Sequence, residues 1–286
     1  MGNSQVCSRT VVSKIKSLLY SVLYFLSTFS SKRYIPILMY HSVGTSGSFF
    51  SVTPSEFTNQ MEFLRRNYDI VSLEDVLSFV SGTVEFSRRS VAITFDDGYY
   101  DNFVNVYPYA KKYELPIAIF VASGYIGKEM SLGNVSLKML SWKEIAEMSK
   151  DTVTIGAHTS SHPDLRRLDL NRAQNEIEMS KVEIERATGR PVNFFAYPKG
   201  AYNNALFNLL KSSGFSSAFQ VGEGLVRKGD NPYELKRVSI DSSVNYRVFV
   251  AKLTTASEWY AELEKACGKL ISFLSSLSGI VKYNGQ

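Results

Sequence analysis

Two adjacent carboxylates are the first residues of this 286-residue sequence whose types and spacing favour chemistry. Asp96 and Asp97 follow the apolar run 91–95 and precede Gly98, which permits a tight turn and the close approach of a ligand. Neighbouring side chains of an extended segment point in different directions, so one carboxylate can bind a metal while the other faces a bound water. An ordinary Asp-Gly turn is the alternative interpretation.

Two of the three histidines in the chain supply a second part of such a site. His158 and His162 are four positions apart, and two imidazoles with one carboxylate form a ligand set that leaves positions open for water and substrate. These ligand types favour zinc as the divalent metal, and nickel, cobalt, manganese and iron also fit them. Two hydrogen-bonded loop histidines are the alternative, which the nearby Asp pair makes the weaker one.

The elements that must position these residues are strands that alternate with helices. Short runs rich in β-branched and aromatic residues predict strands. The predicted strands are 34–40, 91–95, 116–121, 152–157, 192–197 and 215–220, with weaker candidates near 69–72 and 236–240. A capping box at Ser141 and Glu144 and an amphipathic pattern over 171–187 predict two of the helices. This alternation indicates a largely parallel sheet, with a barrel as the leading architecture and an open doubly wound sheet second.

The candidate residues all follow predicted strands. His41 follows 34–40, the Asp pair follows 91–95, His158 follows 152–157, and the run YPKG ends a further strand. Because the carboxyl ends of parallel strands meet at one edge of a sheet, we expect these side chains to lie on the same face of the molecule.

Three motifs in this order resemble the polysaccharide deacetylase family, the NodB homology domain of carbohydrate esterase family 4. They are TFDDG at 94–98, HTSSHPDL at 158–165 and FFAYPKG at 194–200. The resemblance covers about residues 35–245 and implies a distorted (β/α) barrel of about seven strands as a single catalytic domain. It further implies that a metal is held by Asp97, His158 and His162 and that Asp96 is the catalytic base.

Two positions depart from the family pattern. Ala196 stands where the third motif usually has an arginine that orients the catalytic Asp, and Arg237 is a candidate substitute. No histidine follows His162, so the usual carboxyl-terminal catalytic histidine is missing. The run MYHSV at 39–43 resembles the branch that deacetylates poly-N-acetylglucosamine, which implies that His41 is the catalytic acid. A core histidine is the alternative for His41.

The third motif also contributes candidate substrate residues. Tyr197 is expected to contact a sugar, and a backbone N–H near Lys199 is expected to stabilise an oxyanion. The resemblance implies a hydrolase that removes N-acetyl groups from N-acetylhexosamine units of a polysaccharide and releases acetate and a free amine. The alternatives are a deacylase of a small or lipid-linked amino sugar in surface-glycan synthesis and a non-catalytic glycan-binding module. A glycan-binding module has no need for a base beside a metal, so the Asp pair and the histidines argue against it.

We expect an apolar, anchor- or signal-like segment at 1–33, the polysaccharide deacetylase domain that the resemblance implies at 34–250, and a C-terminal helix with a polar tail at 251–286. The net charge of +5 comes from dispersed basic residues with a surplus near the N-terminus, which indicates no nucleic-acid partner and favours a membrane surface. The mostly apolar run 11–29 predicts an anchor or interfacial helix, with a signal peptide or a packed helix as alternatives. We therefore expect a location at the cell envelope or a membrane, including an extracellular one, with the cytoplasm still open.

The two cysteines, Cys7 and Cys267, lie at opposite ends of the chain. Their spacing excludes a disulfide scaffold and a CxxC zinc site. No pattern in the sequence indicates an oligomeric state.

Overall fold

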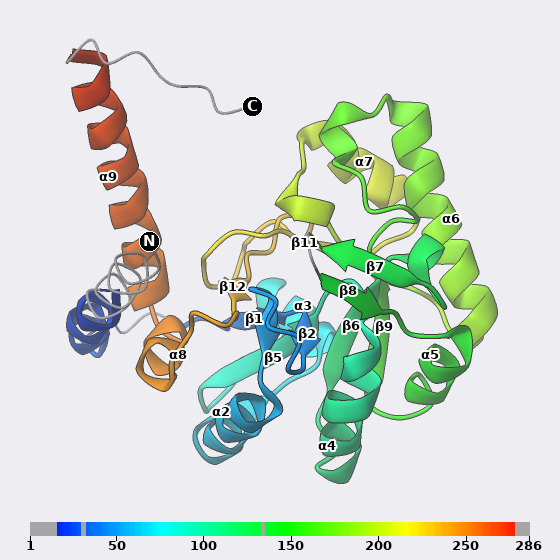
Figure 1. Cartoon of the computed structure of the whole chain (residues 1–286), viewed down its shortest axis with the longest axis horizontal. Coiled ribbons are helices and arrows are strands. Elements are labelled where there is room, and N and C mark those ends of the chain that lie inside the picture. The colour runs from blue at the N-terminus through cyan, green and yellow to red at the C-terminus, as the bar shows by residue number, and fades with distance from the viewer. Residues whose placement is uncertain (1–15, 30–32, 133–134, 278–286) are drawn as a thin grey trace.

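A curled parallel sheet surrounded by helices forms the centre of the protein (Figure 1). This structure, a computed structural model, describes residues 16–29, 33–132 and 135–277. The strand order is β11-β10-β9-β6-β5-β1-β12, with β4 paired to β5. The strands are β1 Ile37–Tyr40, β4 Asp69–Ile70, β5 Ser90–Phe95, β6 Ile117–Val121, β9 Val153–Ala157, β10 Phe194–Ala196, β11 Ser217–Phe219 and β12 Val238–Ser239. All their pairings are parallel, so the predicted distorted (β/α) barrel is confirmed.

Helices surround this sheet. They are α2 Pro54–Asn67, α3 Leu73–Val80, α4 Tyr107–Lys112, α5 Trp142–Met148, α6 Leu170–Thr188, α7 Asn204–Ser212, α8 Tyr246–Lys252 and α9 Ala256–Leu277. Most of them pack on the first of the sheet's two apolar clusters, α3 packs on the second, and α9 lies beside the barrel. A further helix spans residues 16–27. Two small sheets, which the sequence patterns did not predict, flank the carboxyl ends of the barrel strands. They are the parallel pair β2 Ser42–Val43 and β3 Ser51–Val52, and the antiparallel pair β7 Glu129–Leu132 and β8 Val135–Lys138.

Local sequence signals fix where the helices begin and end. The capping box of Ser141 and Glu144 starts α5, because each side chain satisfies a backbone N–H that the first turn leaves unpaired. Helix α6 spans nearly the predicted range and ends at Gly189, whose φ of 67° suits a residue without a Cβ.

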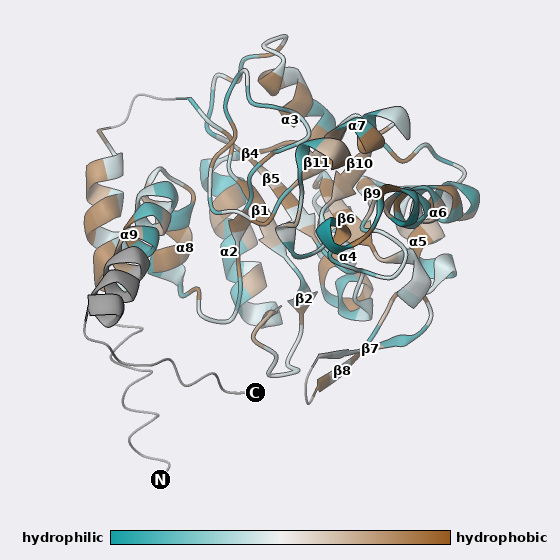
Figure 2. Cartoon of the chain, turned by 90° about the horizontal axis from the view of Figure 1, so that it is seen from above, coloured by the Kyte–Doolittle hydropathy of each residue, from teal (hydrophilic) through white to brown (hydrophobic). Residues whose placement is uncertain are grey.

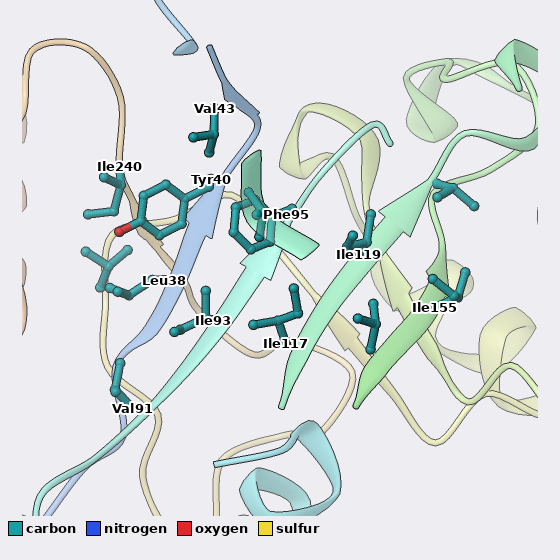
Figure 3. Close-up of a cluster of buried hydrophobic side chains, with 14 of the residues drawn as sticks. Leu38, Tyr40, Val43, Val91, Ile93, Phe95, Ile117, Ile119, Ile155 and Ile240 are labelled. Atoms are coloured by element: carbon teal, nitrogen blue, oxygen red, sulfur yellow. The ribbon is translucent and has the colours of Figure 1, made fainter. Parts of the chain in front are cut away.

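The central strands are buried on both faces, and alternate residues fill two separate apolar clusters. Leu38, Ile93 and Ile119 lie on one face of neighbouring strands (Figure 3), while Ala92 belongs to the cluster on the other. Since side chains alternate along a strand, Asp96 continues the face of Ala92. Asp96 therefore lies at the carboxyl end of the row of side chains that fills the second cluster.

The remaining segments lie beside the barrel. The helix of residues 16–27 packs against α9, where Tyr20 stacks on Tyr260 with ring centroids 4.3 Å apart. Within the described residues, none of the helices is both long and apolar enough to cross a membrane. Residues 1–15 and 30–32 of the predicted 1–33 segment, and 278–286 of the predicted tail, lie outside the described residues.

Candidate active site

The carboxyl ends of β1, β5 and β9 bring the predicted polar residues together. One carboxylate oxygen of Asp97, Oδ1, lies 3.5 Å from Nε2 of His158 and 3.4 Å from Nε2 of His162. The ligand-type atoms of these three residues all lie within 4.8 Å of one another. Among the described residues, Asp97 Oδ1 is buried and has no hydrogen-bond partner. One unpaired carboxylate oxygen and two imidazole nitrogens together form a donor set that suits a zinc-type ion. These three residues therefore fit a metal.

The backbone is held in sparsely populated conformations around these ligands. Asp97, Thr159 and His162 have φ values of 70°, 65° and 58°, which non-glycine residues adopt at a cost of about 1–3 kcal/mol each. At Gly98 a Cβ would lie 2.9 Å from the Val121 side chain, so only glycine fits the turn that follows Asp97. Such strain persists where the surrounding structure imposes it, which is typical of functional sites.

Each histidine ring is oriented for ligation. Nδ1 of His158 lies 2.7 Å from the backbone oxygen of Ala196, which leaves Nε2 directed to Asp97. Burial and the neighbouring His158 lower the pKa of His162 to about 4, although Asp97 acts in the opposite direction. The His162 ring is therefore neutral at physiological pH, with a lone pair available for a metal.

A carboxylate on α6 organises the loop between the two histidines, and sequence reasoning missed it. Glu176 Oε2 accepts hydrogen bonds from the backbone N–H groups of Ser160 and Ser161 at 3.0 and 2.8 Å. Its Oε1 accepts a 2.6 Å bond from the Ser161 hydroxyl. No spacing rule links a helix residue to a loop that precedes it by 15 or 16 positions, so only the fold reveals this contact.

Replacement of Glu176 by alanine is expected to weaken zinc binding by about 10- to 100-fold, because residues that orient metal ligands have effects of this size. Competition with a chromogenic chelator measures the affinity. Glu178→Ala is the matched control, since Glu178 lies on the same helix but contacts Gln174 and Ser213 instead. Unchanged zinc affinity in Glu176→Ala would remove this role from Glu176.

Asp96 forms a fully buried ion pair with Arg237. The two guanidinium NH groups donate to the two carboxylate oxygens, each at 2.6 Å, and both side chains are at most 1% exposed. Arg237 also donates to Thr94 Oγ1 and from Nε to the backbone oxygen of Gln220. Burial raises the pKa of Asp96, but the charges of Arg237, His158 and His41 outweigh it and bring this pKa to about 2. Asp96 is therefore an oriented carboxylate across the physiological pH range.

His41 lies at the same end of the barrel, between β1 and β2. Its backbone oxygen accepts a 2.9 Å hydrogen bond from the Asn102 side chain, and its half-buried ring lies 5.1 Å from that of Phe50. His41 also makes the smallest of the contributions that lower the pKa of Asp96.

The third motif contains Tyr197 and Lys199, which were expected to contact the substrate. Tyr197 is fully buried, and its hydroxyl donates to the backbone oxygen of Tyr233, so its side chain packs in the core and does not face the site. Lys199 has a φ of 58°, and its charge makes a small contribution to lowering the pKa of His162.

Two exposed aromatic residues near His41 also escaped sequence reasoning. Phe49 and Phe50 are 58% and 41% exposed, and their rings pack edge to face at 5.5 Å. The loop that carries them projects from the same side of the molecule as the β7–β8 hairpin (Figure 2). The sequence did carry a signal for them, because two adjacent phenylalanines stand in a run that is otherwise rich in serine and glycine.

The family model described as polysaccharide deacetylase matches residues 83–218. The Bacillus subtilis (strain 168) protein YxkH, whose name places it among polysaccharide deacetylases, is 29% identical over 218 residues, or 76% of this chain and 75% of that protein. The poly-beta-1,6-N-acetyl-D-glucosamine N-deacetylase of Staphylococcus aureus (strain MSSA476) is 29% identical over 203 residues, 67% of this chain and 68% of that protein.

Solved structures share the fold. The deacetylase PplD of Streptococcus pyogenes, in complex with acetate, has a TM-score of 0.69 at 23% identity and covers 78% of this chain and 99% of that one. IcaB of Ammonifex degensii has a TM-score of 0.68 at 24% identity, with 78% and 98% covered. The range matched by the family model contains Asp96 and all three metal-type ligands, so the sequence match and the assembled site concern the same residues. Sequence and fold therefore both match this chain to the polysaccharide deacetylases, a family of hydrolases.

Proposed function

We propose that this protein hydrolyses the N-acetyl groups of N-acetylhexosamine units in a polysaccharide and that a divalent metal supports the reaction. The observation that carries the proposal is the convergence of Asp97, His158 and His162 next to the buried pair of Asp96 and Arg237. A glycan-binding module has no use for an oriented base beside a metal-type ligand set. The name of the Staphylococcus aureus relative supports poly-N-acetylglucosamine as the substrate class.

Asp97, His158 and His162 would hold the metal, and their ligand types favour zinc. A metal there supplies Lewis acidity, which polarises the acetyl carbonyl and makes water a better nucleophile at neutral pH. The strained backbone at Asp97 and His162 and the bond from His158 to Ala196 keep the ligands in place before binding.

The protein's own groups then move the protons. Asp96, ionised and held by Arg237, accepts a proton from the attacking water. A backbone N–H near Lys199 donates to the oxygen that gains negative charge. His41 donates a proton to the departing amine nitrogen, so that the C–N bond breaks and acetate and a free amino sugar are released.

Phe50 is expected to support an adjacent sugar ring, because exposed aromatic faces stack on apolar faces of sugars. Replacement of Phe50 by alanine should raise KM by about fivefold with little change in kcat, since a stacking contact contributes about 1 kcal/mol to binding. Steady-state kinetics on oligomers provide the measurement, with Val104→Ala as an exposed apolar control. A change in kcat without a change in KM would assign Phe50 to the support of His41 instead.

Acetate release from β-1,6-linked N-acetylglucosamine oligomers by the zinc-loaded full chain tests the proposed function. We expect release that depends on zinc and that is lost in His41→Ala although zinc stays bound. Bound zinc without release from any oligomer would overturn the polysaccharide assignment. Faster release from a monomeric or lipid-linked amino sugar would favour the deacylase alternative.

A further inference from the structure

A second surface of the molecule lies far from the active site and has the features of a ligand-binding region. On the helix of residues 16–27, Tyr20 and Ser27 face the body of the protein, and the Ser27 hydroxyl lies 2.9 Å from that of Thr254. The opposite side exposes large apolar side chains, which we call the apolar face. It comprises Leu18, Leu19, Val22, Phe25, Leu26 and the adjoining Phe29, of which Phe29 is 76% exposed.

Helix α9, which packs against the 16–27 helix, also exposes large apolar side chains. Trp259 and Leu263 are four positions apart and are both exposed, so they share one side of α9. Figure 2 shows apolar colour on the 16–27 helix where it lies beside α8 and α9, at the edge of the molecule. The face belongs to a projecting helix and is no groove, so it suits a yielding apolar medium better than a protruding protein segment.

A cationic cavity lies beside the C-terminal end of the 16–27 helix, where Ser27 and Thr28 contribute to its lining. It measures about 210 Å³ and lies between the end of the 16–27 helix and the loop that joins α3 to β5. Arg33, Arg88 and Arg89 line it together with hydroxyl groups such as those of Ser87 and Ser90, and no described lining residue is acidic.

The charges of these arginines are only partly compensated. Arg88 pairs with Asp69, and Arg33 lies 3.6 Å from Glu85, with both of the latter side chains 66% exposed. Arg89 is exposed and has no ion pair within the described part of the chain. Guanidinium and hydroxyl donors without a carboxylate in the lining match a phosphate group.

We propose that the apolar face rests in the interface of a bilayer that contains anionic phospholipid, with a lipid phosphate bound by the arginines of the cavity. Apolar side chains on one side of a helix with basic residues at its border are the pattern of an interfacial helix. The cavity lies at the amino ends of β1 and β5, whereas the catalytic residues lie at their carboxyl ends. The bound protein therefore keeps its active site about one strand length, roughly 17 Å, away from the cavity.

Vesicle sedimentation with the full chain tests this proposal. We expect binding to vesicles of equal parts phosphatidylcholine and phosphatidylglycerol that is at least about tenfold tighter than binding to phosphatidylcholine alone. Phe25→Ser combined with Phe29→Ser should weaken binding by about tenfold or more, and Arg89→Gln by about fivefold on the anionic vesicles only. Val182→Ser and Arg190→Gln, which are exposed positions outside this region, are the matched controls.

The outcomes separate the proposal from its competitors. Urea unfolding midpoints equal to that of the wild type show that the variants are folded, without reference to catalysis. Equal vesicle binding by the wild type and the Phe25/Phe29 variant would overturn the membrane assignment, as would absence of binding. A concentration-dependent dimer that this variant abolishes, without vesicle binding, would assign the face to a second copy of the chain. Unchanged anionic preference in Arg89→Gln would remove the lipid phosphate from the cavity.

Discussion

Replacement of Asp96 by asparagine is expected to lower kcat for acetate release by about 10²- to 10⁴-fold, the usual contribution of a general base. Asparagine keeps the shape of the side chain but its amide does not accept a proton. The three metal-type ligands stay intact, so the zinc content should equal that of the wild type. Stopped assays of acetate together with elemental analysis of the same sample measure both quantities.

Asp151→Asn is the control for this experiment. Asp151, like Asp96, is an acidic residue with a basic partner, here Lys111. It precedes β9 at the opposite end of the barrel, so its replacement should leave kcat unchanged. Full activity in Asp96→Asn with zinc bound would show that another group acts as the base. Loss of zinc in that variant would mean that Asp96 takes part in ligation.

Replacement of Arg237 by methionine is expected to reduce the free energy of unfolding by about 3–5 kcal/mol at neutral pH, because it leaves the buried Asp96 charge without its partner. The deficit should shrink in mildly acidic solution. In the wild type the pKa of Asp96 is lowered to about 2, so the contribution of the pair is present above the ordinary carboxylate pKa and is lost as pH falls through about 2. Without Arg237, burial raises that pKa, and protonation then relieves the variant as pH falls.

Urea unfolding of Arg237→Met at neutral and mildly acidic pH measures this effect. The double variant Asp96→Asn/Arg237→Met should be more stable than Arg237→Met alone, because it removes the unpaired charge as well. Equal destabilisation of the single and double variants at both pH values would indicate a packing defect and no electrostatic role for the pair.

Much of the fold was predictable because its signals are local. The run 91–95 is apolar at every position except Thr94, which is typical of a strand buried on both faces. It matches β5 closely. Ser141 and Glu144 bond to each other's backbone over three positions, so their capping box was readable without the fold. The Asp97, His158 and His162 set was found because two motifs follow strands whose ends must meet.

The contacts that sequence patterns did not reveal are non-local or depend on side-chain direction. Arg237 was predicted only as a candidate, since 141 positions separate it from Asp96 and no periodicity links them. Tyr197 lies inside a motif, but its side chain points into the core, where its hydroxyl donates to the backbone oxygen of Tyr233. The spacing of a motif does not predict the direction of a side chain. The β7–β8 hairpin was missed because half of the described residues in β8 are exposed, so it lacks the apolar run of a barrel strand.

The position of Arg237 also sets when the site becomes complete during synthesis of the chain. β11 and β12 are the two ends of the main sheet, and Arg237 spans the gap by bonding to Gln220 and Gly222 beyond β11 and to Asp96. A nascent chain that has left the ribosome only through β11 has every motif and every metal-type ligand, but Asp96 still lacks its cation. The Asp96 carboxylate is therefore fixed in the same late step that docks the last strand, and a chain released before that step would hold the three metal-type ligands without an oriented Asp96.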